Sequence, residues 1–125
     1  MRLLLDTHVF LWAVSDSKKL KTAARQHMLA ADAIYVSAAS IWEIAIKSRL
    51  GKIEGDPERL AQAIAQSGFI ELPVSSAHAA RVSKLPIHHH DPFDRLLLAQ
   101  SLTEPLILLT ADALLPQYGD WVTLV

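Results

Sequence analysis

The sequence predicts an α/β fold in which a mostly parallel β-sheet is covered by helices on both faces. Segments typical of strands and segments typical of helices alternate along the whole chain. The strand-like segments are continuously apolar, as expected for strands that are buried on both faces of a sheet. Such an alternation of buried strands and helices is the pattern of α/β proteins.

Five short apolar runs are predicted to be strands. The first run, "RLLL", stops at Asp6 and Thr7, where a helical pattern begins. The last run, "WVTLV", closes the sequence. We therefore expect a sheet of about five strands, at residues 2–5, 33–37, 69–74, 106–110 and 121–125.

The segments between these runs are predicted to be helices. Residues 18–31 are rich in helix-forming residues and place apolar side chains at helical spacing. Residues 56–68 begin with an N-cap Asp and a Pro at the first helical position, and they end at a Gly. The expected helices are 8–14, 18–31, 38–52, 56–68, 75–85 and 91–104, with one or two helical turns at 112–118.

Length and composition limit the class of protein. The 125 residues suit a single domain, residues 1–125, and an apolar fraction of 51% excludes a disordered chain. The absence of cysteine excludes disulfides and thiolate metal sites. There is no signal-peptide pattern, and no apolar run reaches the ~18 residues of a membrane span. We expect a soluble, cytoplasmic protein with no membrane association.

The charge of the chain argues against a simple DNA-binding module. Twelve Lys and Arg stand against 13 Asp and Glu, which gives a net charge of −1, whereas such modules are usually strongly basic. If this protein handles nucleic acid, it needs either a local basic surface or a site that recruits cations.

Several acidic residues fall where an α/β sheet binds its ligands, beyond the carboxyl ends of the strands. Asp6 directly follows the first strand, and Asp112 follows the fourth. Asp91 and Asp94 stand at the start of a predicted helix. Glu43 lies in an apolar helical turn, where a carboxylate needs either an exposed stripe or a partner.

Each of these acids also has a purely structural explanation. Asp91 suits a helix N-cap, as do Asp6 or Thr7 before the first helix and Asp112 or Thr110 after the fourth strand. Asp94 would interact favourably with the dipole of the helix that it begins. Glu43 suits an i,i+4 ion pair with the lysine that follows it on an exposed helix face.

Taken together, the acids predict a metal site. If Asp6, Glu43, Asp94 and Asp112 converge, two carboxylates roughly 4 Å apart repel by about 4 kcal/mol at an effective dielectric of ~20. Several of them cannot all stay ionised without a cation. Ligands that are all oxygen atoms suit Mg²⁺ or Mn²⁺. An ion held in this way can activate water for the cleavage of a phosphodiester.

Four motifs carry a resemblance to a known family. They are "LLLDTHVFLW" at 3–12, "SAASIWEIAIK" at 37–47, "HHHDPFDRLLLAQ" at 88–100 and "LLTAD" at 108–112. In this order they resemble the PIN domain, and within it the VapC-like toxins of bacterial toxin–antitoxin pairs. The usual length of the family covers essentially the whole chain.

The resemblance implies a three-layer α/β/α sandwich and an endoribonuclease that depends on Mg²⁺, with Mn²⁺ able to substitute. The family's four acids match Asp6, Glu43, Asp94 and Asp112, which would be both catalytic residues and metal ligands. Asp91 lies three residues before Asp94 and is a second candidate for the third acid.

The resemblance also implies a supporting residue and partners. Thr110 matches a threonine that supports the family's site. The substrate would be RNA, and the products would carry 5′-phosphate and 3′-hydroxyl ends. A small antitoxin would cover the acidic cleft with its tail, often inserting an arginine. Homodimers are usual in the family.

Three histidines and two cations near the motifs have more than one interpretation. His88, His89 and His90 do not have the spacing of a zinc site. We expect a loop with one histidine near the cleft, contacting RNA or a carboxylate. Arg95 suits either a solvated face or a phosphate contact. Lys47 suits either a pair with the glutamate one turn before it or a place in the cleft.

Basic and aromatic residues elsewhere are expected to be structural. The cluster at residues 18–25 suits a solvated helix face, with steering of RNA as the alternative. The run "FLW" at 10–12 and Trp42 suit the core or a dimer surface better than a base-stacking platform.

Two other functions share an acidic pocket on a parallel sheet. A phospho-receiver, which is a non-enzymatic binding domain, needs an Asp at the end of the third strand, where this chain has "FIELPV". A phosphatase of the haloacid-dehalogenase type needs a second Asp two residues after the first, where this chain has His8. Both patterns favour the nuclease, and an acidic-pocket binding domain without nuclease activity is the alternative if the acids do not converge.

Overall fold

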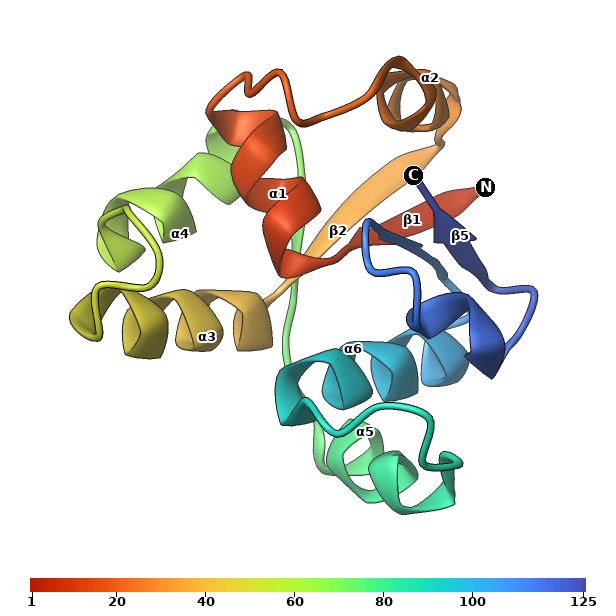
Figure 1. Ribbon diagram of the computed structural model, residues 1–125. Helices are drawn as coiled ribbons and strands as arrows, with labels where there is room; N and C mark the ends of the chain where they lie inside the picture. Colours follow the sequence, from red (N-terminus) through yellow and green to blue (C-terminus); the bar gives the residue numbers. More distant parts are fainter.

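The computed structural model describes residues 1–125 around one five-stranded sheet (Figure 1). All neighbouring strands are parallel, which confirms the predicted sheet, and their order is β3-β2-β1-β4-β5. The central strand is β1, flanked by β2 and β4. The strands are β1 (Arg2–Leu5), β2 (Ala33–Ser37), β3 (Ile70–Leu72), β4 (Ile107–Thr110) and β5 (Val122–Leu124).

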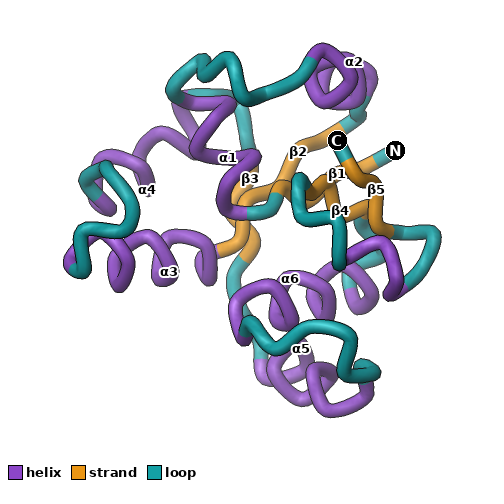
Figure 2. Tube along the Cα trace, viewed as in Figure 1, coloured by secondary structure: helices purple, strands orange, loops and turns teal.

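Helices fill every connection between consecutive strands (Figure 2). Two helices connect β1 to β2, and two more connect β2 to β3. The α-helices are α1 (Thr7–Val14), α2 (Thr22–Ala30), α3 (Ala38–Arg49), α4 (Pro57–Gln66), α5 (Ser76–Arg81) and α6 (Pro92–Thr103). The 3₁₀ helices are η1 (Val82–Lys84) and η2 (Leu115–Tyr118).

The side chains of β1 divide the core into two halves, because successive residues of a strand point to opposite faces. Leu3 and Leu5 pack in a cluster with residues of α1, α2, α3 and α4. Leu4 packs in the other cluster with residues of α6 and the two 3₁₀ helices. The sheet is thus the middle of three layers, and the predicted α/β/α sandwich is confirmed.

Strand β3 is shorter than the predicted 69–74, α3 ends at Arg49 and not at residue 52, and η2 begins at Leu115 and not at residue 112. Two further helices differ from the prediction. Helix α2 begins at Thr22, and not at residue 18, because the Ser17 hydroxyl and carbonyl accept from the backbone N–H groups of Lys19 and Leu20. This turn directs Leu20 into the core, where it is buried. The helix predicted over 75–85 is α-helical only to Arg81 and then tightens into η1.

No helix of the structure is both long enough and apolar enough to cross a bilayer.

The feature that matters for function is the carboxyl edge of the sheet. Helix α1 leaves the end of β1 there, helix α3 leaves the end of β2, and the segment after β4 passes beside them.

Candidate active site

A cavity of about 360 Å³ opens at the carboxyl edge of the central strands. The chain crosses to opposite sides of β1 at this point, since β2 lies on one side of it and β4 on the other. Such a reversal is where parallel sheets bind ligands. All four acids predicted from the sequence line the cavity, as does Asp91: the lining residues are Asp6, His8, Trp12, Glu43, Lys47, His89, Asp91, Asp94, Ala111 and Asp112.

Asp6 has both a structural and a site position. Its Oδ1 accepts from the Val9 backbone N–H at 2.8 Å and so caps α1. Its Oδ2 accepts from the Thr110 hydroxyl at 2.6 Å and from the Ala111 N–H at 3.3 Å. Burial raises the pKa of Asp6, and the hydrogen bonds from Thr110, Val9 and Ala111 oppose that rise.

Thr110 links two of the acids. While its hydroxyl donates to Asp6, the same oxygen accepts from the Asp112 backbone N–H at 3.0 Å. Thr110 is fully buried at the end of β4. It therefore fixes the spacing between the ends of β1 and β4.

Glu43 is buried and fully engaged. Its Oε1 accepts from the Thr7 hydroxyl at 2.6 Å, and its Oε2 lies 2.6 Å from Lys47 Nζ. This hydrogen bond to Glu43 is the largest influence that raises the pKa of Lys47. The predicted i,i+4 pair therefore exists, but it lies on the cavity side of α3 and not on an exposed face.

Asp91 and Asp94 have different positions at the start of α6. Asp91 Oδ1 accepts from the backbone N–H groups of Phe93 at 2.8 Å and Asp94 at 3.2 Å, so Asp91 is the N-cap. Asp94 lies in the first turn of α6 and lines the cavity. Burial, followed by the nearby charges of Asp91, Asp6 and Glu43, raises the pKa of Asp94 to about 7.

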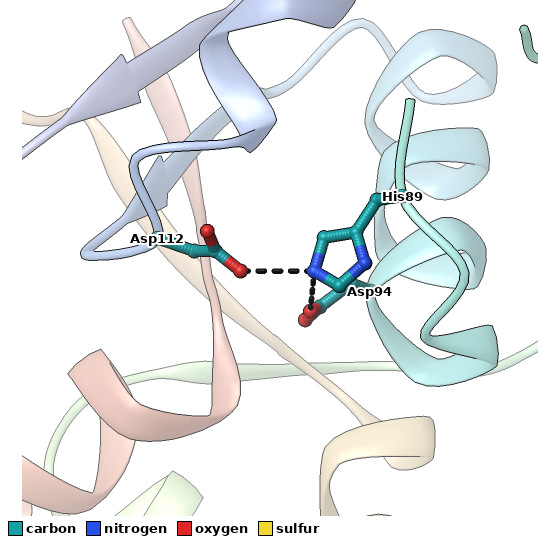
Figure 3. A group of neighbouring side chains, drawn as sticks. All are labelled: His89, Asp94 and Asp112. Atoms are coloured by element: carbon teal, nitrogen blue, oxygen red, sulfur yellow. Dashed lines mark hydrogen bonds and ion pairs between the residues drawn. The ribbon is translucent and has the colours of Figure 1, made fainter. Parts of the chain in front are cut away.

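His89 lies between Asp94 and Asp112 (Figure 3). Its Nε2 is 2.9 Å from Asp112 Oδ2 and 3.3 Å from Asp94 Oδ2. Its Nδ1 accepts from the Asp91 backbone N–H at 3.2 Å. Since Nδ1 is an acceptor, the ring proton stands on Nε2 and points at the two carboxylates. The expected contact between one histidine of the loop and a carboxylate is confirmed.

Arg95 differs from both of its predicted positions. Its guanidinium donates to the carbonyls of Pro86 at 2.9 Å and Val82 at 3.3 Å, and to the Tyr118 hydroxyl at 3.1 Å. It is thus neither a solvated charge nor a free phosphate ligand. It holds the loop that carries His89 against α6, because five donors in a rigid fork suit several carbonyls at once.

Tyr118 fixes the same loop from the other side. Its hydroxyl oxygen accepts from the backbone N–H of His88 at 3.1 Å and of His89 at 3.0 Å. Sequence reasoning did not assign site positions to Thr7 or Tyr118. Thr7 adjoins Asp6 in the sequence, but no local pattern marks Tyr118, which lies 29 residues beyond His89.

The aromatic run of α1 packs against the core, as expected, and Trp12 has a second position that was not expected. Phe10 is buried in the core, as expected, but Trp12 is partly exposed and lines the acidic cavity together with His8. The two rings lie one helical turn apart, with centroids separated by 6.0 Å. Trp42 is 60% exposed and meets Phe93 edge-on, outside the cavity.

Fold and cavity together define a class: a parallel α/β/α protein with a carboxylate-rich site where the sheet reverses its strand order. The sequence model of the PIN domain matches residues 3–120, and the chain belongs to this family. No curated protein sequence gives a significant match.

Solved structures share the fold at low sequence identity. A toxin–antitoxin complex from Klebsiella pneumoniae matches with a TM-score of 0.66 and 19% identity, over 97% of this chain and 95% of the other. VapBC2 from Rickettsia felis, bound to a promoter DNA fragment, matches with 0.68 and 16%, over 100% and 98%. FitAcB from Neisseria gonorrhoeae matches with 0.54 and 20%, over 88% and 87%.

Proposed function

We propose that this protein is a metal-dependent endoribonuclease that hydrolyses RNA phosphodiester bonds with a metal-activated water. The observation that carries the proposal is the gathering of five carboxylates around one small cavity that holds a single lysine. Membership of the PIN family supports the same reaction.

The donor set fits a divalent cation. The carboxylates supply oxygen ligands, which Mg²⁺ and Mn²⁺ prefer. The pKa of Asp94, raised to about 7, reflects the cost of adding another negative charge to a cavity where burial and neighbouring carboxylates oppose it. Asp6, Glu43, Asp94 and Asp112 would hold the ion. When bound, it supplies a water of lowered pKa and neutralises charge on the phosphoryl group.

The residues around the acids have distinct tasks in this proposal. Thr110 and the Val9 N–H hold the two oxygens of Asp6 in fixed directions. Thr7 and Lys47 do the same for Glu43. Such outer contacts orient metal ligands and restrict their rotation. Most of the polar contacts in the cavity therefore hold the carboxylate groups in fixed orientations.

His89 would contribute a neutral hydrogen-bond donor. Its Nε2–H points at oxygens of Asp94 and Asp112, and the Asp91 N–H fixes the tautomer. In the complex with substrate this donor is placed to hold a carboxylate or a phosphate oxygen at the site. A donor of this kind stabilises developing negative charge without a proton transfer of its own.

We further propose that the chain is the toxin of a toxin–antitoxin pair. The matched Klebsiella structure is a toxin–antitoxin complex, and this chain covers nearly all of the matched Klebsiella and Rickettsia chains. In this proposal a small antitoxin covers the acidic cavity and keeps the enzyme inactive. An arginine of the antitoxin would replace the cation as the partner of the carboxylates. The protein would form homodimers, as its family usually does.

A cleavage assay tests the proposal. The purified chain, free of any partner, is incubated with end-labelled structured and unstructured RNAs in Mg²⁺, Mn²⁺ or EDTA. We expect cleavage that needs the metal and that falls by at least ~100-fold in Asp94→Asn, given the usual effect of removing one charge-stabilising group. The control Asp120→Asn removes an exposed carboxylate outside the cavity. Equal cleavage by Asp94→Asn and the control would overturn the assignment of the site.

A further inference from the structure

A second groove adjoins the acidic cavity. It has a volume of about 580 Å³ and lies between α1, the turn after it and the segment that joins α3 to α4. Its lining residues include His8 and Trp12 of α1, and also Lys19, Lys52 and Glu54. Since His8 and Trp12 also line the acidic cavity, the two spaces share one wall.

The charges of the groove differ from those of the cavity. Lys19 and Lys52 are exposed, and neither ammonium forms a salt bridge or a hydrogen bond. By contrast, Lys47 in the cavity is paired with Glu43. Two free cations face one acid, Glu54, in the groove. The groove therefore suits an anionic ligand, whereas the cavity beside it suits a cation.

The shared wall is aromatic. His8 and Trp12 are at i and i+4 of α1 and thus lie on the same helix face. Their rings are inclined at 53° and are accessible, since His8 is exposed and Trp12 is partly exposed. Basic grooves with accessible aromatic side chains are the recurring way in which proteins bind single-stranded nucleic acid. Bases paired within a duplex are stacked and cannot reach such a wall.

We propose that this groove binds the single-stranded RNA segment next to the scissile phosphate. A base packs on Trp12 and His8, and Lys19 and Lys52 contact the phosphates that follow. The inference rests on the proposed ribonuclease function, since it names the flanking subsite of the same reaction. It also requires that the enzyme cut RNA where the strand is unpaired.

Binding of a short, unstructured, fluorescein-labelled RNA in EDTA tests the subsite without cleavage. The double variant Lys19→Gln/Lys52→Gln is compared with Lys18→Gln/Lys21→Gln, which removes the same charge from exposed lysines outside the groove. We expect the groove variant to weaken binding about 20-fold at 0.1 M salt and to reduce the salt slope by about 1.4, as for two single-strand phosphate contacts. The control should change neither.

Two further arms test the aromatic wall and the strand preference. Trp12→Leu should weaken binding about tenfold, as for the loss of one stacked base, whereas Trp42→Leu, an exposed tryptophan outside both spaces, should have no effect. A blunt RNA duplex should bind the unmodified chain more weakly than the single strand. Equal loss in groove and control variants, or equal affinity for the duplex, overturns the inference.

A parallel cleavage assay of the unmodified chain in Mg²⁺ separates this inference from the proposed function. Cleavage with equal RNA affinity in groove and control variants leaves the nuclease intact and refutes the groove. Binding that needs the groove, without metal-dependent cleavage, refutes the nuclease and keeps the groove. If the assays detect neither RNA binding nor cleavage, both the nuclease and the groove proposals are refuted.

Discussion

At the scale of single residues, Asp94 is a group whose ionisation the fold opposes. Its pKa is raised to about 7 from an ordinary value of 3.8. Between these values the folded chain keeps a proton that the unfolded chain has released, so the free energy of unfolding falls as pH rises. The loss is complete above the folded-state pKa.

The first prediction concerns Asp94→Asn without metal. The variant should be more stable than the unmodified protein by up to about 4 kcal/mol at pH 8, because ~3 units of pKa correspond to that free energy. Near pH 4 the two should be equal. Urea unfolding in EDTA at pH 4, 6 and 8 measures this, with Asp120→Asn as the control. A stability difference that does not vary with pH would contradict the raised pKa.

The second prediction concerns the Thr110 hydroxyl, which is buried between two site acids. Thr110→Val keeps the shape but leaves Asp6 Oδ2 and the Asp112 N–H without that partner. Such losses cost about 1–3 kcal/mol each when buried, and the pKa of Asp6 should rise further. Chemical denaturation measures the loss of stability, and its dependence on pH measures the rise in the pKa of Asp6. Thr103→Val, which removes only a bond to the Ala99 carbonyl, is the control; an equal effect there would refute a special position for Thr110.

At the scale of elements, the start of α6 separates the positions of Asp91 and Asp94. The third prediction is that Asp91→Asn folds normally and keeps most of its Mn²⁺ affinity, because asparagine caps helices as well as aspartate. Asp94→Asn should lose most of that affinity. Calorimetric titration with Mn²⁺ compares the two, and circular dichroism checks the fold. Greater loss in Asp91→Asn would make Asp91 the principal third acid.

The loop that carries His89 is the other element to test. The fourth prediction is that Tyr118→Phe exposes the amides of His88 and His89 to solvent, since both donate to the Tyr118 hydroxyl. Hydrogen exchange at these two amides should speed up by roughly tenfold, as for the loss of about 1.4 kcal/mol. Tyr35→Phe removes a hydroxyl without hydrogen-bond partners in the chain and should leave both rates unchanged. Unchanged rates in Tyr118→Phe would show that Arg95 alone holds the loop.

These elements also show which features of the fold and the site could be predicted from the sequence. The strands and the acids at their ends were predictable, because apolar runs mark buried strands and Asp6 and Asp112 adjoin two of them. The position of His89 was not, because it depends on the direction of the Arg95 side chain, six residues further on, and on Tyr118, which lies 29 residues away. Three consecutive histidines do not reveal which of them turns inward. The late start of α2 was hidden for a similar reason, since helix-forming lysines precede a residue that the core requires.

At the scale of the whole molecule, the acidic cavity couples cation binding to folding. The fifth prediction is that Mg²⁺ or Mn²⁺ raises the free energy of unfolding, by about 2.7 kcal/mol at 100 times the dissociation constant. EDTA should reverse the gain. Thermal unfolding with and without the ion measures it. Asp94→Asn should show little of the gain and Asp120→Asn all of it; an equal gain in both would place the cation elsewhere.

Substitution of Asp6 and substitution of Asp94 affect the stability of the fold differently. This difference has a consequence for cells that carry the gene. Asp6 also caps α1 through the Val9 N–H, so most substitutions there damage the fold as well as the site. Replacing Asp94 by a neutral residue relieves its repulsion with the neighbouring carboxylates. If the protein is toxic as proposed, survivors of its forced expression that still accumulate full-length protein should carry missense changes at Asp94 more often than at Asp6. Selection would then inactivate the enzyme at the position, Asp94, where the inactivating change also raises the stability of the fold.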